Sequence, residues 1–107
     1  MADIAFEDDL GEAQRDWLRT RITTKRGDVV DFTAQYETLD RGRRVAVIRY
    51  DCAHGFLHVD VLNLHGDVVV KESLPSYLSM KEALNFGIDD IEDRWRAYKQ
   101  RFFGESS

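Results

Sequence analysis

The stretch WLRTRITTKRGDVVDFTAQY, residues 17–36, carries the pattern that decides the predicted fold. On both sides of a turn at residues 26–28, side chains expected to face the core alternate with polar side chains. This alternation is typical of two half-buried β-strands. A three-residue loop aligns the two runs so that inward residues face each other, for example Ile22 and Phe32. The sequence therefore predicts an antiparallel hairpin with one buried face.

Three more alternating runs follow, at residues 43–51, 56–64 and 67–72, and short turns separate them. Since each run directly follows its neighbour along the chain, the economical topology is a five-stranded antiparallel meander over residues 16–73. The single proline, Pro75, ends this region.

A helix is predicted after the sheet. Ser79 and Glu82 have the spacing of a capping box, in which each side chain binds a free backbone amide at a helix start. Apolar residues then recur at intervals of four and three, as Leu84, Ile88, Ile91, Trp95, Tyr98 and Phe102. This stripe predicts a helix over residues 79–103 that packs on the inward face of the sheet. Gly87 allows a break or kink in this helix.

The 107 residues are enough for one domain, and the predicted class is α+β: an antiparallel meander with a C-terminal helix on one face. A content of 43% hydrophobic and 33% charged residues excludes wholesale disorder. Residues 1–14 are acidic and show no sustained period, so we expect a flexible or loosely docked arm there.

Cellular location is predicted from what the sequence lacks. No apolar run reaches the ~18 residues that would span a bilayer. The N-terminal residues do not resemble a secretory signal, and the single cysteine, Cys52, cannot form an internal disulfide. These features predict a cytoplasmic protein that does not contact membranes.

The net charge of −5 is distributed unevenly. Residues 1–14 and 50–107 are acidic, whereas residues 15–49 carry nine basic and five acidic side chains. The overall acidity argues against non-specific binding to nucleic acid, which depends on neutralising phosphates. Residues 15–49, which are basic overall, could still form a local phosphate-binding surface.

Side chains that could act as acids, bases or phosphate-binding groups concentrate in RYDCAHGFLHVD, residues 49–60. A four-residue loop places Arg49 opposite His58 on the face away from the helix, with Asp51 and Asp60 on the same face and His54 in the turn. Such a set could supply a general base, a general acid and a cation for a developing phosphate charge. The simpler alternative is the solvated face of a one-sided sheet.

Signals for a cofactor are missing from the sequence, and the signal for a metal is weak: His58 and Asp60 share one face and lie close enough to share an ion in principle. The sequence contains no Walker loop, no GxGxxG, no nucleophile-elbow GxSxG, and no CxxC or HExxH frame. We therefore predict no cofactor and no metal site.

The outer face of the predicted sheet is also partly apolar. By alternation, five apolar side chains point outward: Val47, Phe56, Leu62, Leu64 and Val69. They could form a patch that is covered by the N-terminal arm, through Ile4, Phe6 and Leu10, or by a partner chain.

The string RYDCAHGFLHVDVL followed by HGDVVVKE resembles the signature of a small, uncharacterised bacterial family with an R-Y-D-x-A-H-G-x-x-H-x-D core. More distantly it resembles TumE-like proteins, which are toxins of toxin–antitoxin pairs and carry R-x-D-x-A-x-H. The likeness covers residues 18 to about 75. It implies that the positions of interest are Arg49, Asp51, His54 and His58.

Two functions fit these residues. The first is a protein-binding module that uses Phe56, Asp60 and Leu62 on the outer face, with a second copy or another protein as partner. The alternative is a toxin-like enzyme acting on RNA. In that role His54 or His58 is the acid or base, Arg49 stabilises phosphate charge and Asp51 orients the histidine.

Overall fold

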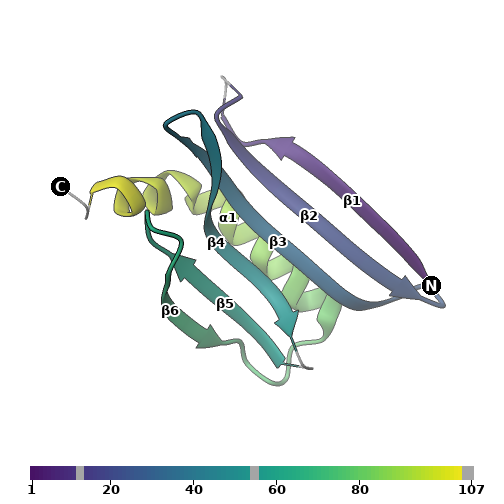
Figure 1. Cartoon of the computed structure of the whole chain (residues 1–107). Helices are drawn as coiled ribbons and strands as arrows, with labels where there is room; N and C mark the ends of the chain where they lie inside the picture. Colours follow the sequence, from purple (N-terminus) through teal and green to yellow (C-terminus); the bar gives the residue numbers. More distant parts are fainter. Residues whose placement is uncertain (12–13, 54–55, 105–107) are drawn as a thin grey trace.

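The structure is a computed structural model that describes residues 1–11, 14–53 and 56–104. Within these ranges six strands form one antiparallel sheet in chain order, and a single helix follows and packs on it, which is an α+β fold (Figure 1). The strands are β1 (Ala2–Asp9), β2 (Asp16–Lys25), β3 (Asp28–Asp40), β4 (Arg43–Ala53), β5 (Phe56–Leu62) and β6 (Val68–Ser73), and the helix is α1 (Met80–Gly104).

The N-terminal arm is an edge strand, so the prediction of five strands was one short. β1 pairs with β2 along its whole length, although all its side chains are exposed. Strand pairing at a sheet edge needs only backbone hydrogen bonds, and these leave no apolar period in the sequence. Ile4 and Phe6 face Ile22 and Thr20 of β2, so they extend the inner face and do not cover the outer one.

The predicted hairpin of β2 and β3 is confirmed in its register. Ile22 faces Phe32 and Leu18 faces Tyr36. The turn has two residues rather than three, because Arg26 and Gly27 both adopt positive φ (55° and 84°) and a bulge at Thr23/Thr24 absorbs the extra residue.

Bulges also remove most of the apolar patch that was expected on the outer face. Between β3 and β4 the register shifts at Tyr36/Glu37, and Val47 belongs to the core at 1% exposure. A second shift at Val61/Leu62 accompanies burial of Leu62. Strict alternation predicted the wrong side for Val47, because the inserted residue in β4 changes the side-chain parity there.

Helix α1 begins with the predicted capping box. The amide of Glu82 donates to Ser79 Oγ at 3.1 Å, and the amide of Ser79 donates to Glu82 Oε1 at 3.0 Å. The helix then continues through Gly87 to its end as one element, and the kink expected near Gly87 stays a prediction. A Cβ atom on Gly87 would lie 2.8 Å from Cγ of Tyr50, which shows that this glycine permits close contact with β4.

Two carboxylates, the buried Asp16 and the partly buried Asp90, connect the helix to the inner face. The first is Asp16 of β2, which accepts hydrogen bonds from the Tyr36 hydroxyl (2.6 Å), the Thr38 hydroxyl (2.8 Å) and the Lys99 ammonium of α1 (3.1 Å). Each oxygen of this carboxylate therefore has a partner, as burial of a charge requires.

The second of these carboxylates is Asp90, which lies on α1 itself. It accepts hydrogen bonds from the hydroxyls of Tyr50 (2.6 Å) and Tyr98 (2.5 Å). Burial and the hydrogen bond to Asp90 raise the pKa of Tyr98 to about 12. The same causes raise the pKa of Tyr50 further.

We predict that Gly87→Ala destabilises the protein. Alanine is favoured over glycine inside a helix by about 1 kcal/mol, but overpacking typically costs about 1–3 kcal/mol and here meets a buried ring. Denaturant unfolding should show a net loss of stability. Gly104→Ala is the matched control, because a Cβ atom there would have no neighbour within 4 Å, and it should be neutral or stabilising. A Gly87→Ala variant more stable than the wild type would contradict this close packing.

We also predict a loss of stability at alkaline pH that involves Tyr98. Its folded pKa of about 12 lies above the ordinary value of 10.0, so the folded state holds the proton more tightly than the unfolded chain. The corresponding stabilisation is complete below pH 10 and is lost as the pH rises through about 12. Tyr98→Phe should reduce the alkaline slope of the unfolding free energy. An unchanged slope would contradict the prediction.

Candidate functional site

The outer face of the sheet carries two rows of polar side chains that cross the strands. Residues directly opposite each other on neighbouring strands point to the same face, so the register defines the rows. The first row is Arg19, Gln35, Arg49, Asp60 and Lys71, and the second is Arg21, Thr33, Asp51, His58 and Ser73. Helix α1 packs on the opposite face, mainly against β3 and β4, so it leaves both rows uncovered (Figure 1).

The register of β4 and β5 differs from the predicted one by two residues. Asp51 faces His58, and Arg49 faces Asp60, whereas Arg49 had been expected opposite His58. Asp60 in turn faces Lys71 of β6. A shift of two residues preserves the face, so the four predicted strand residues still share the outer side. The predicted site residue His54 lies outside the described residues.

His58 is the centre of a compact cluster with two carboxylates. Its Nε2 atom lies 2.7 Å from Asp51 Oδ1 and 3.8 Å from Asp60 Oδ2. Its Nδ1 atom lies 3.3 Å from the carbonyl oxygen of Phe56, which can only accept a hydrogen bond. The imidazole was expected to be exposed, but only 7% of the residue is accessible.

The two carboxylates of this cluster are incompletely satisfied. Within the described ranges of the chain, buried oxygen atoms of both Asp51 and Asp60 lack a hydrogen-bond partner. Asp60 is only 6% exposed. Burial raises the pKa of Asp51 above its ordinary value, while His58 acts in the opposite direction. Unsatisfied buried carboxylates are costly, which sets this cluster apart from an ordinary solvated sheet face.

Arginines of the neighbouring strands extend the site. Arg49 donates through Nε to Gln35 Oε1 at 2.6 Å, and it makes no ion pair with any carboxylate in the described ranges. Arg19 and Arg21, with Thr33 and Gln35, line a shallow depression of about 200 Å³ on the same face. This surface offers guanidinium, hydroxyl and amide groups beside the Asp51–His58–Asp60 cluster.

A second polar network on this face has a structural role. Arg44 pairs with Glu37 of β3 and Glu7 of β1, each at 3.0 Å, and its guanidinium stacks over Trp17 at 4.0 Å. Glu37 also accepts a hydrogen bond from Gln35 at 2.5 Å. These contacts link the edge strand to the sheet. Sequence reasoning missed them because they depend on the bulge between β3 and β4.

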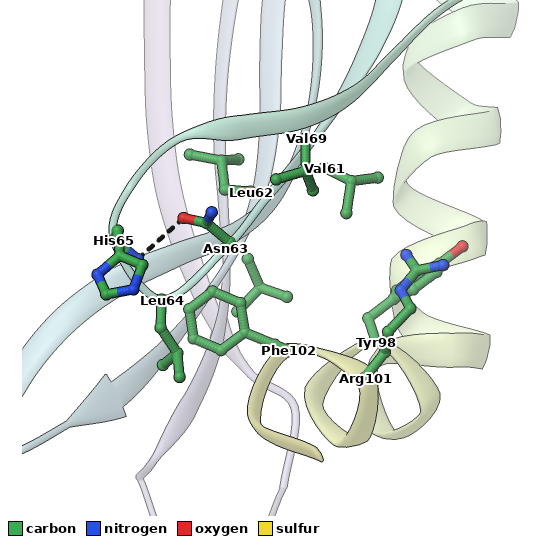
Figure 2. A pocket seen from close by; sticks show the side chains of 10 residues that line it. Val61, Leu62, Asn63, Leu64, His65, Val69, Tyr98, Arg101 and Phe102 are labelled. Atoms are coloured by element: carbon green, nitrogen blue, oxygen red, sulfur yellow. Dashed lines mark hydrogen bonds between the residues drawn. The ribbon is translucent and has the colours of Figure 1, made fainter. Parts of the chain in front are cut away.

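The remaining predicted binding residues are divided between surfaces. Phe56 is 72% exposed at the hairpin end of β5, whereas Leu62 contributes to a pocket of about 300 Å³. The pocket lies between the C-terminal end of α1 and the end of β5, where Tyr98, Arg101 and Phe102 approach the turn after Leu62 (Figure 2). Its lining is largely apolar, so the chemically capable groups are on the outer sheet face.

No helix in the described ranges has the length and apolar character needed to span a membrane. No curated protein and no solved structure matches the chain. The resemblance to TumE-like toxins therefore stays a prediction. A family model described as a domain of unknown function, DUF7718, matches residues 1–107. This match over the full length shows that the chain belongs to the DUF7718 family.

Proposed function

We propose that the outer sheet face binds a phosphate-bearing ligand and that RNA is its substrate class. One observation carries the proposal: the buried His58 lies between Asp51 and Asp60, and this cluster spans the two rows of the outer face that also contain the arginines of β2 and β4. Guanidinium groups are well suited to phosphate, because they donate parallel hydrogen bonds to two oxygens.

The arginines are available for such a ligand. Arg49 makes no close ion pair among the residues that the structure describes, and its side chain donates to Gln35. Arg19 and Arg21 pair with carboxylates at 3.7 and 3.3 Å, but both side chains are largely exposed. The exposed pair of Arg21 and Asp31 contributes little, so a phosphate group can replace that carboxylate at small cost. Glu37 keeps Arg44 as a partner at 3.0 Å if Arg19 turns to a phosphate.

A phosphate held by Arg49 would lie beside the cluster, because Arg49 faces Asp60 and is two residues from Asp51. The imidazole of His58 and the two carboxylates are then the groups nearest to the phosphorus. This arrangement supports an activity on phosphodiester bonds rather than binding alone. The chain's net negative charge favours a short or single-stranded ligand over an extended duplex, since few phosphates can be neutralised.

The test is RNA binding by Arg49→Gln, measured by fluorescence anisotropy with a short labelled RNA in the presence of a chelator. We expect binding to weaken about tenfold, since a hydrogen bond to a charged group contributes about 1.5–3 kcal/mol. The slope of the logarithm of the binding constant against the logarithm of the salt concentration should fall by about one, which corresponds to the loss of one phosphate contact. Arg41→Gln removes the same charge from an exposed turn and should bind like the wild type. Equal binding by wild type and Arg49→Gln would refute the proposal.

We also propose a second role, a protein-interaction module that acts through self-association at β6. The supporting observation is that β6 is an edge strand with all six residues exposed, including three consecutive valines. An edge strand offers unpaired backbone groups, and a second copy of β6 could pair with it in antiparallel orientation. This surface replaces the outer-face patch as the candidate for protein contact.

Sedimentation over a range of concentrations tests this second role. We expect association by the wild type that Val69→Lys abolishes, because a charged side chain at the edge opposes strand pairing. Val30→Lys places the same residue at another exposed strand position and should leave association unchanged. A wild-type chain that stays monomeric at high concentration would exclude self-association through β6.

A further inference from the structure

We propose that Asp51, His58 and Asp60 form a binding site for a divalent transition-metal ion, with Zn²⁺ and Mn²⁺ as the fitting chemistry. Each of the three residues offers one ligand atom, and these atoms all lie within 4.8 Å of one another. The site comes from two adjacent strands, β4 and β5, whose register places Asp51 directly opposite His58.

The orientation of His58 is that of a metal ligand. The carbonyl oxygen of Phe56, 3.3 Å from Nδ1, accepts a hydrogen bond when Nδ1 carries the ring proton. In the neutral imidazole this leaves the lone pair of Nε2 directed at two carboxylates. Histidines that bind metals commonly donate their other ring N–H to a backbone carbonyl in this way.

The carboxylates supply a second, independent observation. Asp60 is more than nine-tenths buried, and its Oδ1 atom has no hydrogen-bond partner among the described residues. Asp51 Oδ1 is likewise without a hydrogen bond, although it lies 2.7 Å from Nε2. A cation shared by these atoms would satisfy the oxygens that protein donors leave unsatisfied.

Charge and ligand type indicate the class of ion. Two carboxylates and a neutral imidazole carry a charge of −2, which a divalent cation neutralises. Imidazole nitrogen suits Zn²⁺, whereas carboxylate oxygens also suit Mn²⁺. Three protein ligands leave at least one position open for water or substrate, which is typical of catalytic rather than structural zinc sites. The neighbouring cations Arg49 and Lys71 face Asp60 from both sides, and would hold an anion near that open position.

This inference goes beyond the proposed RNA activity and does not depend on it, because cation binding is measured without nucleic acid. If RNA binding fails in the presence of a chelator while the metal binds, only the RNA proposal is lost. If the metal fails to bind while Arg49→Gln weakens RNA binding, only the metal site is lost.

The experiment is isothermal titration of the full chain with MnCl₂ and, separately, ZnCl₂. We expect one ion per chain and a rise in melting temperature on binding. Asp60→Asn should weaken binding by at least about tenfold, since loss of even a supporting group commonly costs 10–100-fold. Asp67→Asn makes the same change at an exposed turn residue and should bind like the wild type.

A measurement on the wild type keeps the test decisive if Asp60→Asn does not fold. Paramagnetic Mn²⁺ should broaden the ring signals of His58 and leave those of His65, in the β5–β6 turn, sharp. Binding of neither ion at millimolar concentration would overturn the proposal. Broadening that affects other carboxylates and spares His58 would overturn it equally.

Discussion

The packing of α1 across the inner face of β3 and β4 is the contact on which the rest of the structure depends. Gly87 allows the helix to approach the ring of Tyr50, and Trp95 packs edge-on against Tyr36 with ring centroids 6.0 Å apart. Because the described chain has one helix for a six-stranded sheet, only one face is covered (Figure 1). The other face must be polar, and its polar side chains are arranged in rows by the strand register.

The two faces bury carboxylates in different ways. On the inner face, Asp16 and Asp90 accept hydrogen bonds from tyrosine hydroxyls and contribute to helix attachment. On the outer face, one buried oxygen each of Asp51 and Asp60 accepts no hydrogen bond from the described residues, although Asp51 Oδ1 lies 2.7 Å from Nε2 of His58. The first arrangement is what stability requires of a buried polar group, whereas the second costs stability. Local departures of this kind are expected where a site serves a ligand rather than the fold.

The position of the candidate site on a flat, one-sided sheet has consequences for its chemistry. Strands hold neighbouring side chains at fixed spacing, so Asp51 and His58 meet without needing a flexible loop. The adjoining arginines come from other strands of the same sheet and share its rigidity. A ligand on this face therefore meets an arranged set of cations and acids on an open surface, which suits a polymer segment better than an enclosed small molecule.

Errors in the predicted register had different effects on the face assigned to each side chain. The hairpin of β4 and β5 was predicted two residues out of register, yet Arg49, Asp51, His58 and Asp60 remained on one face because side chains alternate with a period of two. At Val47 an inserted residue changed the side-chain parity and moved an expected surface residue into the core. Bulges leave no clear mark on composition, since one extra residue in a strand changes the pairing without changing the types of residue present.

The sequence by itself determined the order of the strands from β2 to β6, the inward set of β2 and β3, the capping box and the amphipathic helix. These features follow from local periodicity and from spacings of a few residues. Only the tertiary structure decided that β1 joins the sheet, that Gly87 serves packing, and that His58 is buried between Asp51 and Asp60. Each of these depends on backbone pairing or on contacts between distant segments, for which a single chain's residue pattern carries no direct signal.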